Sequence, residues 1–284
     1  MRVRIIVDST ADLAPELKGQ IEIVPLTVNF GTEEYIDGIT ITHEEFYNKL
    51  IESDVLPTTS QATPAAFEKI FEEVAAAGDS AVVITLASQL SGTCQSARIA
   101  AEDYENIYVV DSGSVTLGTG ILAEYALRCA CSGMAADEIA ALLEGKKEDI
   151  CLIAMLDTLE YLKKGGRISA AVAFAGGLLN IKPVVNVKDG VIHMLGKARG
   201  SKQGNNLLVQ EIGKTGGIDF EMPILLGYSG LSDTLLKKYI TDSAPLWENG
   251  VEALRYNSIG SVVGTHAGPG AIAAAFFHKA ASRR

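Results

Sequence analysis

The segment Ala81-Val-Val-Ile-Thr-Leu-Ala-Ser-Gln-Leu-Ser-Gly-Thr-Cys-Gln-Ser96 combines an apolar strand, a polar turn and the beginning of a helix. The apolar run ends at Leu86, hydroxyl side chains and Gly92 follow, and a helical pattern starts at about Thr93. In an open α/β sheet, such a turn directs backbone N–H groups and hydroxyls to one place beyond the strand's carboxyl end. The segment therefore predicts a site for an anion, such as a carboxylate or a phosphate.

The same order of strand, polar turn and helix occurs twice more in the first half of the chain. Val3–Val7 and Ile107–Val110 are apolar strands, and helical patterns follow their turns at Ala11–Lys18 and Thr119–Cys131. Strands that alternate with helices are typical of a parallel sheet. We therefore expect an N-terminal α/β domain, with an open, mostly parallel sheet and helices on both faces.

A short β excursion and two helix starts lie between the first and second of these units. Residues 21 to 41 alternate like short strands and predict a small hairpin. Thr42 is expected to cap a helix at His43–Glu52, with Glu45 placed for a capping box. A second helix is expected to begin at Pro64.

The pattern changes near residues 145–149, where we place a domain boundary, with one domain at 1–148 and the other at 149–284. Beyond it we expect a strand at Cys151–Met155 and a hairpin of Lys182–Val187 with Val191–Leu195. The last expected element is a helix at about Ala271–Ala281. Strands and helices mixed in this way indicate an α+β domain with two layers.

Composition excludes several classes of protein. The chain has 24 Lys and Arg residues against 35 Asp and Glu residues, which gives a formal charge of −11, and it has no basic tract. This composition argues against electrostatic binding to nucleic acids or to anionic lipids. No apolar run approaches the roughly 20 residues of an integral membrane segment. The four cysteines form no Cys-x-x-Cys pair and are expected to be buried, reduced thiols of a cytoplasmic protein. They are Cys94, Cys129, Cys131 and Cys151.

Hydroxyl groups gather at two of the predicted turns, at residues 58–60 and 88–93. Each can be a helix cap, but together, at the strand ends of one sheet, they favour a shared ligand site, because hydroxyls bind a carboxylate without adding charge. His266 lies in a glycine-rich segment that we expect to precede the last helix, which would begin at Pro269. It is either a donor to an anion or an ordinary loop histidine. We expect no metal site and no cofactor, because the histidines do not cluster.

Two other patterns allow a different interpretation. Gly118–Ala123 imitates a dinucleotide fingerprint, but it lies too far from the preceding strand. Asp8 and Asp111 both end strands, where a carboxylate usually accepts N–H groups of the turn. The alternative is a carboxylate pair with a metal ion, in a metal-dependent phosphotransferase.

A series of motifs from end to end resembles one family, the DegV fatty-acid-binding proteins that serve bacterial fatty acid kinases. The motifs are Asp8-Ser-Thr-Ala-Asp-Leu13, Thr59-Ser-Gln61, Leu90-Ser-Gly-Thr93, Val110-Asp-Ser112 with Gly118 and Gly120, Leu159-Glu-Tyr-Leu-Lys-Lys-Gly-Gly-Arg-Ile-Ser169, Ile181-Lys-Pro183, Lys197-Ala-Arg-Gly200 and His266-Ala-Gly-Pro-Gly270. Two departures are Ala62, where proline is common, and Thr116, where serine is common. Neither change removes an expected ligand donor.

The resemblance implies two domains with a long-chain fatty acid between them, and a carrier that is not itself an enzyme. Its carboxylate would be bound by Thr59, Ser91, Gly92 and His266. The tail would lie in an apolar tunnel, for which the apolar stretch up to Leu179 is a candidate wall, through Val172, Phe174, Leu178 and Leu179. An ATP-dependent kinase subunit would phosphorylate the carboxylate, with Arg167 and Arg199 as contacts for the phosphate or the kinase. The sequence alone also allows a carrier of another amphipathic acid.

Overall fold

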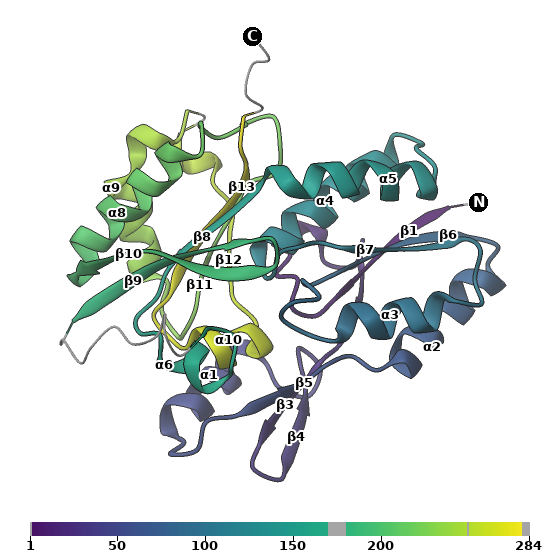
Figure 1. The fold of residues 1–284 in the computed structure, drawn as a ribbon, viewed down its shortest axis with the longest axis horizontal. Helices are drawn as coiled ribbons and strands as arrows, with labels where there is room; N and C mark the ends of the chain where they lie inside the picture. Colours follow the sequence, from purple (N-terminus) through teal and green to yellow (C-terminus); the bar gives the residue numbers. More distant parts are fainter. Residues whose placement is uncertain (1, 170–179, 249, 280–284) are drawn as a thin grey trace.

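A computed structural model describes residues 2–169, 180–248 and 250–279, and it contains two main sheets (Figure 1). The strands of the first sheet all precede residue 112, and those of the second all follow residue 149. A smaller three-stranded sheet lies beside them. The molecule is therefore the mixed α/β protein that the sequence predicts.

The first sheet is parallel throughout, with strand order β2-β1-β6-β7. Its strands are β1 (Val3–Asp8), β2 (Glu22–Val24), β6 (Ser80–Thr85) and β7 (Ile107–Asp111). Every residue of β6 is buried, as expected for a strand covered on both faces. The carboxyl ends of β1, β6 and β7 therefore bring their polar turns to one edge.

Helices cover both faces of this sheet, as predicted. The helices are α2 (Pro64–Ala76), α3 (Thr93–Ala101), α4 (Leu117–Cys131) and α5 (Ala136–Lys146). Ile6 and Val83 pack with α2 and α3 in one core, and Val82 and Ile84 pack with α4 and α5 in another. The alternation of side chains along a strand produces this division. Gly118 and Gly120 lie inside α4, away from the turn that a dinucleotide fingerprint would need.

The β excursion forms a hairpin of β3 (Thr27–Phe30) and β4 (Glu33–Ile36), and β5 (Thr58–Ser60) pairs with β3. The chain between β4 and β5 contains α1 (His43–Glu52). Thr42 caps this helix, and both hydrogen bonds of the predicted capping box with Glu45 are present. Pairing of β5 with β3 fixes the position of Thr59 opposite Val28.

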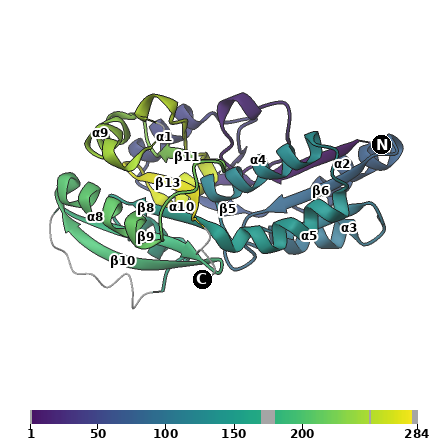
Figure 2. The same cartoon turned by 90° about the horizontal axis from the view of Figure 1, so that it is seen from above.

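The second sheet has the order β10-β9-β8-β13-β11-β12 and is mostly antiparallel. Its strands are β8 (Ile150–Met155), β9 (Ile181–Lys188), β10 (Val191–Arg199), β11 (Leu225–Tyr228), β12 (Tyr256–Ser258) and β13 (Ile272–Phe277). One face is covered by α8 (Gly200–Lys214) and α9 (Thr234–Asp242), which lie at the end of the molecule away from the N-terminus (Figure 2). The predicted layer of helices on a partly antiparallel sheet is confirmed.

Helix α4 packs on the other face of the second sheet and joins the two main sheets. Leu117 and Ile121 belong to one core with Val7 of β1 and with Ala273 and Ala275 of β13. The tip of the β9–β10 hairpin adds a second connection, because the Gly190 N–H donates to the carbonyl of Gly113 at 3.0 Å. The two halves of the chain thus share a continuous core on one side of the space between them.

The prediction of a final helix at Ala271–Ala281 is wrong for the residues that the structure describes. Residues Ile272–Phe277 are the fully buried strand β13, paired on both sides. A run of alanine with isoleucine and phenylalanine is apolar on every side, so periodicity does not separate a buried strand from a buried helix. Pairing with β8 and β11 overrides the helix propensity of alanine.

The position of His266 relative to a helix is also corrected. It lies near the end of α10 (Ser261–Ala267), and Pro269 follows this helix instead of beginning one. Val262, Val263 and Gly264 disfavour a helix by propensity. Tertiary packing outweighs this propensity, because α10 packs closely against α1. A Cβ on Gly264 would lie only 2.5 Å from the hydroxyl oxygen of Tyr47.

Smaller differences concern the ends of elements and one cysteine. The helix expected at residues 11–18 is a 3₁₀ turn at Pro15–Leu17, because proline removes an amide that a longer helix would need. Further 3₁₀ turns are Lys147–Asp149, Ala244–Leu246 and Val251–Ala253, and the helix α6 (Glu160–Lys164) is short. All four cysteines are free, but Cys131 is exposed and Cys151 half-buried, so only Cys94 and Cys129 are buried as predicted.

Candidate functional site

A cavity of about 420 Å³ lies between the carboxyl ends of the parallel strands and the second sheet. Known small-molecule sites have volumes of about 300–1,000 Å³, so the cavity is large enough for a ligand. Its walls come from the turns after β1, β6 and β7, from β5 and α10, and from the facing surface of the second sheet. Residues far apart in the sequence therefore meet at one place.

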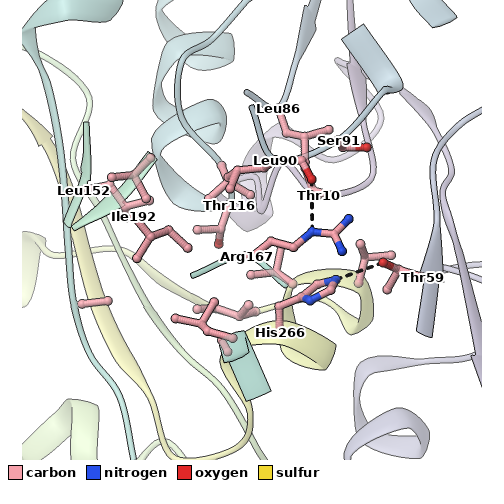
Figure 3. Close-up of a pocket in the computed structure, with 18 of the residues that line it drawn as sticks. Thr10, Thr59, Leu86, Leu90, Ser91, Thr116, Leu152, Arg167, Ile192 and His266 are labelled. Carbon is pink, nitrogen blue, oxygen red and sulfur yellow. Dashed lines mark hydrogen bonds between the residues drawn. The ribbon is translucent and has the colours of Figure 1, made fainter. Parts of the chain in front are cut away.

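Apolar side chains form one end of this cavity. Leu152 and Ile192 lie at that end in Figure 3, across the cavity from Thr59 and Ser91. Apart from Asn186, the other residues of β8, β9 and β13 that line the cavity are also aliphatic. They are Ala154, Val185, Val187 and Ala273. This end can hold a hydrocarbon group but offers a polar group few partners.

The opposite end is polar and contains the hydroxyl groups and the histidine that the sequence singled out. The Thr59 hydroxyl lies 3.0 Å from His266 Nε2, a contact that joins β5 to α10 (Figure 3). His266 Nδ1 is buried and has no hydrogen-bond partner among the described residues. Burial, with a smaller effect of the Arg167 charge, lowers the pKa of His266 to about 4. The imidazole is therefore neutral at pH 7 and presents one N–H donor and one acceptor.

Ser91 and Gly92 close this end from the side of α3. The Ser91 hydroxyl lies 3.0 Å from the Thr93 hydroxyl and accepts the Thr93 N–H at 3.3 Å. The Ser91 amide donates to the Ala87 carbonyl. A Cβ on Gly92 would lie 2.1 Å from Gln61 Oε1, so the side chain of Gln61, which follows β5, packs directly against this turn. The structure thus brings Thr59, Ser91, Gly92 and His266 together, as the resemblance implied.

Arg167 adds a cation to the same end. Its Nε donates to the Leu90 carbonyl at 3.2 Å and one terminal nitrogen donates to the Gly165 carbonyl at 2.7 Å. Figure 3 shows the guanidinium between Ser91 and the His266–Thr59 pair. Of the described residues that line the cavity, none is acidic and Arg167 is the one whose side chain is always charged. A single guanidinium beside neutral donors is suited to an anionic head group.

Other candidate residues lie elsewhere. Arg199 ends β10, is exposed and does not line the cavity. The proposed tunnel-wall residues Val172, Phe174, Leu178 and Leu179 lie outside the described residues. The apolar wall from β8, β9 and β10 was not among our predictions. Alternation of apolar side chains in these strands was a usable signal, but it does not tell which face meets a ligand.

Asp8 and Asp111 bind the turns that follow their strands, the usual role of such residues. Asp8 is fully buried, and one carboxylate oxygen accepts the Thr10 N–H at 3.0 Å while the other accepts the Leu86 N–H at 2.7 Å. Asp111 accepts the N–H groups of Ser88 and Gly113. No cluster of three metal-binding side chains occurs in the described part of the chain. These contacts occupy the oxygens that a metal ion would need.

Replacing Asp8 by asparagine is therefore expected to destabilise the fold. The amide nitrogen of asparagine cannot accept an N–H, so one buried donor loses its partner at a cost of about 1–3 kcal/mol. Urea unfolding at pH 7 measures this loss. Asp111→Asn is the matched control, with a smaller effect because Asp111 is half-buried. An unfolding curve unchanged by Asp8→Asn, with loss of a metal-dependent phosphate transfer, would support the phosphotransferase alternative instead.

Comparison with known proteins identifies the family. Residues 2–279 match the family model described as "Uncharacterised protein, DegV family". A DegV domain-containing protein of Caldanaerobacter subterraneus is 36% identical, over 98% of this chain and 99% of the relative. The chain belongs to the DegV family.

Solved structures agree with this assignment. A DegV family protein from Thermus thermophilus, whose structure is described by its fatty acid binding, is 32% identical with a TM-score of 0.86, covering 98% of this chain and all of that one. The Streptococcus pneumoniae fatty acid kinase (Fak) B3 protein, loaded with linoleic acid, has a TM-score of 0.86, with the same coverage. Its 21% identity supports the fold alone. No helix of the described residues is long and apolar enough to span a membrane.

Proposed function

We propose that this protein is a cytoplasmic, non-catalytic carrier that binds a long-chain fatty acid in its cavity and presents the carboxylate to an ATP-dependent fatty acid kinase subunit. The observation that supports it most is the division of the cavity into an aliphatic end and a polar end with one cation. The DegV protein of Thermus thermophilus, described as fatty acid binding, has the same fold. We further infer that residues 1–148 and 149–284 act as two domains with the ligand between them.

The tail supplies most of the binding free energy in this proposal. Each buried methylene contributes about 0.8 kcal/mol, so a tail of about sixteen carbons gains roughly 10 kcal/mol before the cost of ordering it. The side chains at the aliphatic end, with Val172, Phe174, Leu178 and Leu179 as further candidates, would surround the tail. A carboxylate placed in that end would lose its hydration without a partner, so the head group must lie at the polar end.

The polar end would orient the carboxylate through groups that differ in charge. The Ser91 hydroxyl donates one hydrogen bond, and the Thr59–His266 pair donates a second. Its donor is the Thr59 hydroxyl when His266 Nε2–H donates to Thr59, or His266 Nδ1–H when Thr59 donates to Nε2. Gly92 lies beside Ser91 in the same turn. Arg167 adds a charge-assisted interaction, which is stronger than a neutral one. The carboxylate is thereby held at the polar end of the cavity, and the tail extends from it toward the aliphatic end.

The kinase step belongs to the partner in this proposal. A carboxylate oxygen attacks the terminal phosphorus of ATP, a new oxygen–phosphorus bond forms, and the bond to the leaving ADP breaks. The product is an acyl phosphate that this chain would retain. Arg167 lies where it would offset the added negative charge, and exposed Arg199 is a candidate contact for the kinase. The Fak B3 protein of Streptococcus pneumoniae, which has the same fold, is described as a protein of a fatty acid kinase.

Lipid analysis of the purified protein tests the binding part of this proposal. Protein isolated from bacteria is denatured, extracted with organic solvent and examined by mass spectrometry for fatty acids. We expect long-chain fatty acids at close to one per protein chain, and none above background from an unrelated protein purified in the same way. An empty extract would remove the main support for a carrier. A different amphipathic acid in the extract would replace the fatty acid as the ligand.

A further inference from the structure

Two buried carboxylates and a half-buried histidine form a cluster behind α10, outside the cavity and without a part in the proposed function. They are Asp12 from the loop after β1, Asp37 from the turn after β4, and His43 from the first turn of α1. Each of the two carboxylates is only 4% exposed. Buried carboxylates are costly unless hydrogen bonds satisfy them, so their partners show what they do.

Both carboxylates bind the start of α10. The N–H of Gly260 donates to Asp12 Oδ1 at 2.9 Å, and the N–H of Ser261 donates to Asp37 Oδ1 at 3.2 Å. The residue preceding α10 is a glycine, so it supplies no side chain to cap these amides. Two carboxylates from the N-terminal half of the chain therefore hold the first amides of α10.

Helix α10 is one wall of the cavity. Four of its seven residues line it, and one of these is His266 at the polar end. The others are Val262, Val263 and Ala267. A shift of the first turn of so short a helix moves His266 relative to Thr59, which lies on the separate strand β5.

Asp12 also reaches a second wall of the cavity. Its Oδ2 accepts the hydroxyl of Thr116 at 2.5 Å, and Thr116 lines the cavity on the side of α4. Thr116 has a φ of 50°, a backbone conformation that β-branched residues rarely adopt and that its surroundings must maintain. A single carboxylate thus fixes Thr116 and the start of α10 together.

Two further side chains bind the segment that leads into α10. His43 Nδ1 lies 2.7 Å from the Ser258 hydroxyl, and the Tyr47 hydroxyl donates to the Ile259 carbonyl at 3.0 Å. Gly260 leaves room for this arrangement, since its Cβ would lie 3.3 Å from both Asp12 Oδ1 and His43 Nε2. Residues 258–261 are therefore held at successive positions by side chains of the N-terminal half.

We propose that Asp12 and Asp37 are positioning residues of the ligand site, because they hold the start of α10 and so set the position of His266 opposite Thr59 and Ser91. The identity of the ligand in this inference rests on the proposed function, whereas the positioning of His266 does not.

The charges around the cluster predict a pH dependence. Burial raises the pKa of Asp12 to about 7. The hydrogen bonds from Thr116 and Gly260 and the charge of Lys18 act to lower this pKa, whereas the charge of Asp37 acts to raise it. Burial also raises the pKa of Asp37, and the nearby His43 acts to lower it. The pKa of His43 itself is lowered by burial. Tyr47 faces the same group and stays protonated, because burial raises its pKa. As the pH falls through 7, Asp12 gains a proton on an oxygen that accepts a hydrogen bond, and its hold on α10 weakens.

Histidine resonances in the ligand-free protein test this directly, with wild type compared with Asp12→Asn and Asp37→Asn. Asparagine at position 12 can accept from Gly260 and donate to Thr116, so the variant removes the charge while keeping the shape. We expect both variants to move the His266 ring resonances. We also expect the wild-type His266 resonances to show an inflection near pH 7, where His266 does not itself titrate, and Asp12→Asn to lose it.

Fatty-acid release provides the second measurement, with Asp103→Asn as the control because Asp103 is exposed and does not line the cavity. Loss of the carboxylate charge from the hydrogen bond to α10 predicts a dissociation rate about tenfold faster for Asp12→Asn and Asp37→Asn. If either variant does not fold, Thr116→Val removes the partner hydroxyl of Asp12 instead. Unchanged His266 resonances in the variants, or the same inflection in Asp12→Asn as in wild type, would overturn the positioning role. A wild-type protein that binds no fatty acid would instead refute the proposed function and leave the resonance test valid.

Discussion

Replacing Ile192 by tryptophan is expected to weaken the binding of long-chain fatty acids about 100-fold. Ile192 lies on β10 at the aliphatic end of the cavity, and a larger indole ring there takes the place of part of the tail. Each methylene kept out costs about 0.8 kcal/mol, so exclusion of about four costs roughly 3 kcal/mol. Titration with fatty acids of increasing length measures the effect. Preference should shift to shorter chains.

The neighbouring residue provides a matched control. Val191 precedes Ile192 on the same edge strand, points to the opposite face and is 43% exposed. Val191→Trp adds the same side chain to the same strand and should leave binding unchanged. Equal losses in the two variants would mean that β10 as a whole was disturbed. Full affinity for a long chain in a folded Ile192→Trp protein would show that the tail does not occupy this end.

Removing a head-group donor is expected to have the second large effect. His266→Ala and Ser91→Ala each leave a carboxylate at the polar end without one hydrogen bond, at a cost of about 1.5–3 kcal/mol, or a 10- to 150-fold loss of affinity. Trimming one tail contact, as in Val187→Ala, removes about two methyl groups and should cost less. Equilibrium displacement of a fluorescent fatty acid compares the three variants.

His193→Ala is the control for the histidine variant, because His193 is exposed on β10 and does not line the cavity. It should retain wild-type affinity. The pKa of His266 is lowered to about 4, so its imidazole stays neutral from pH 5 to 8. Titration of His266 itself should therefore not change the affinity for a fatty acid in this range. Retention by His266→Ala and Ser91→Ala equal to that of wild type would refute the assignment of the head group.

The sequence predicted the first half of the fold well because its signals are local. The capping box of Thr42 and Glu45 and the proline in the first turn of α2 involve contacts within one turn, and both are present. The errors occur where distant partners decide. β13 is a strand because β8 and β11 pair with it on both sides. α10 begins where Tyr47 and Asp37 form hydrogen bonds with the backbone of residues 259 and 261.

The candidate site shows the same limit. The polar turns and the motifs were sufficient to single out Thr59, Ser91 and His266, which the structure brings to one cavity end. The resemblance implied Arg167 as a contact for the phosphate or the kinase, but the sequence did not place it between these donors, because its position depends on the chain reversal at Gly165 and Gly166 after α6. The sequence did not predict the aliphatic wall. Alternation of apolar side chains in β9 and β10 does not reveal which face of the second sheet lies against the first half of the molecule.

A crystal structure of the protein with a long-chain fatty acid is the most direct test of the central claim, that one cavity binds the acid by a polar end and an aliphatic end. We expect the carboxylate within hydrogen-bond distance of Ser91, Thr59 or His266 and near Arg167, and the tail directed toward Leu152 and Ile192. A carboxylate directed toward Leu152, or a fatty acid bound elsewhere with the cavity empty, would contradict it.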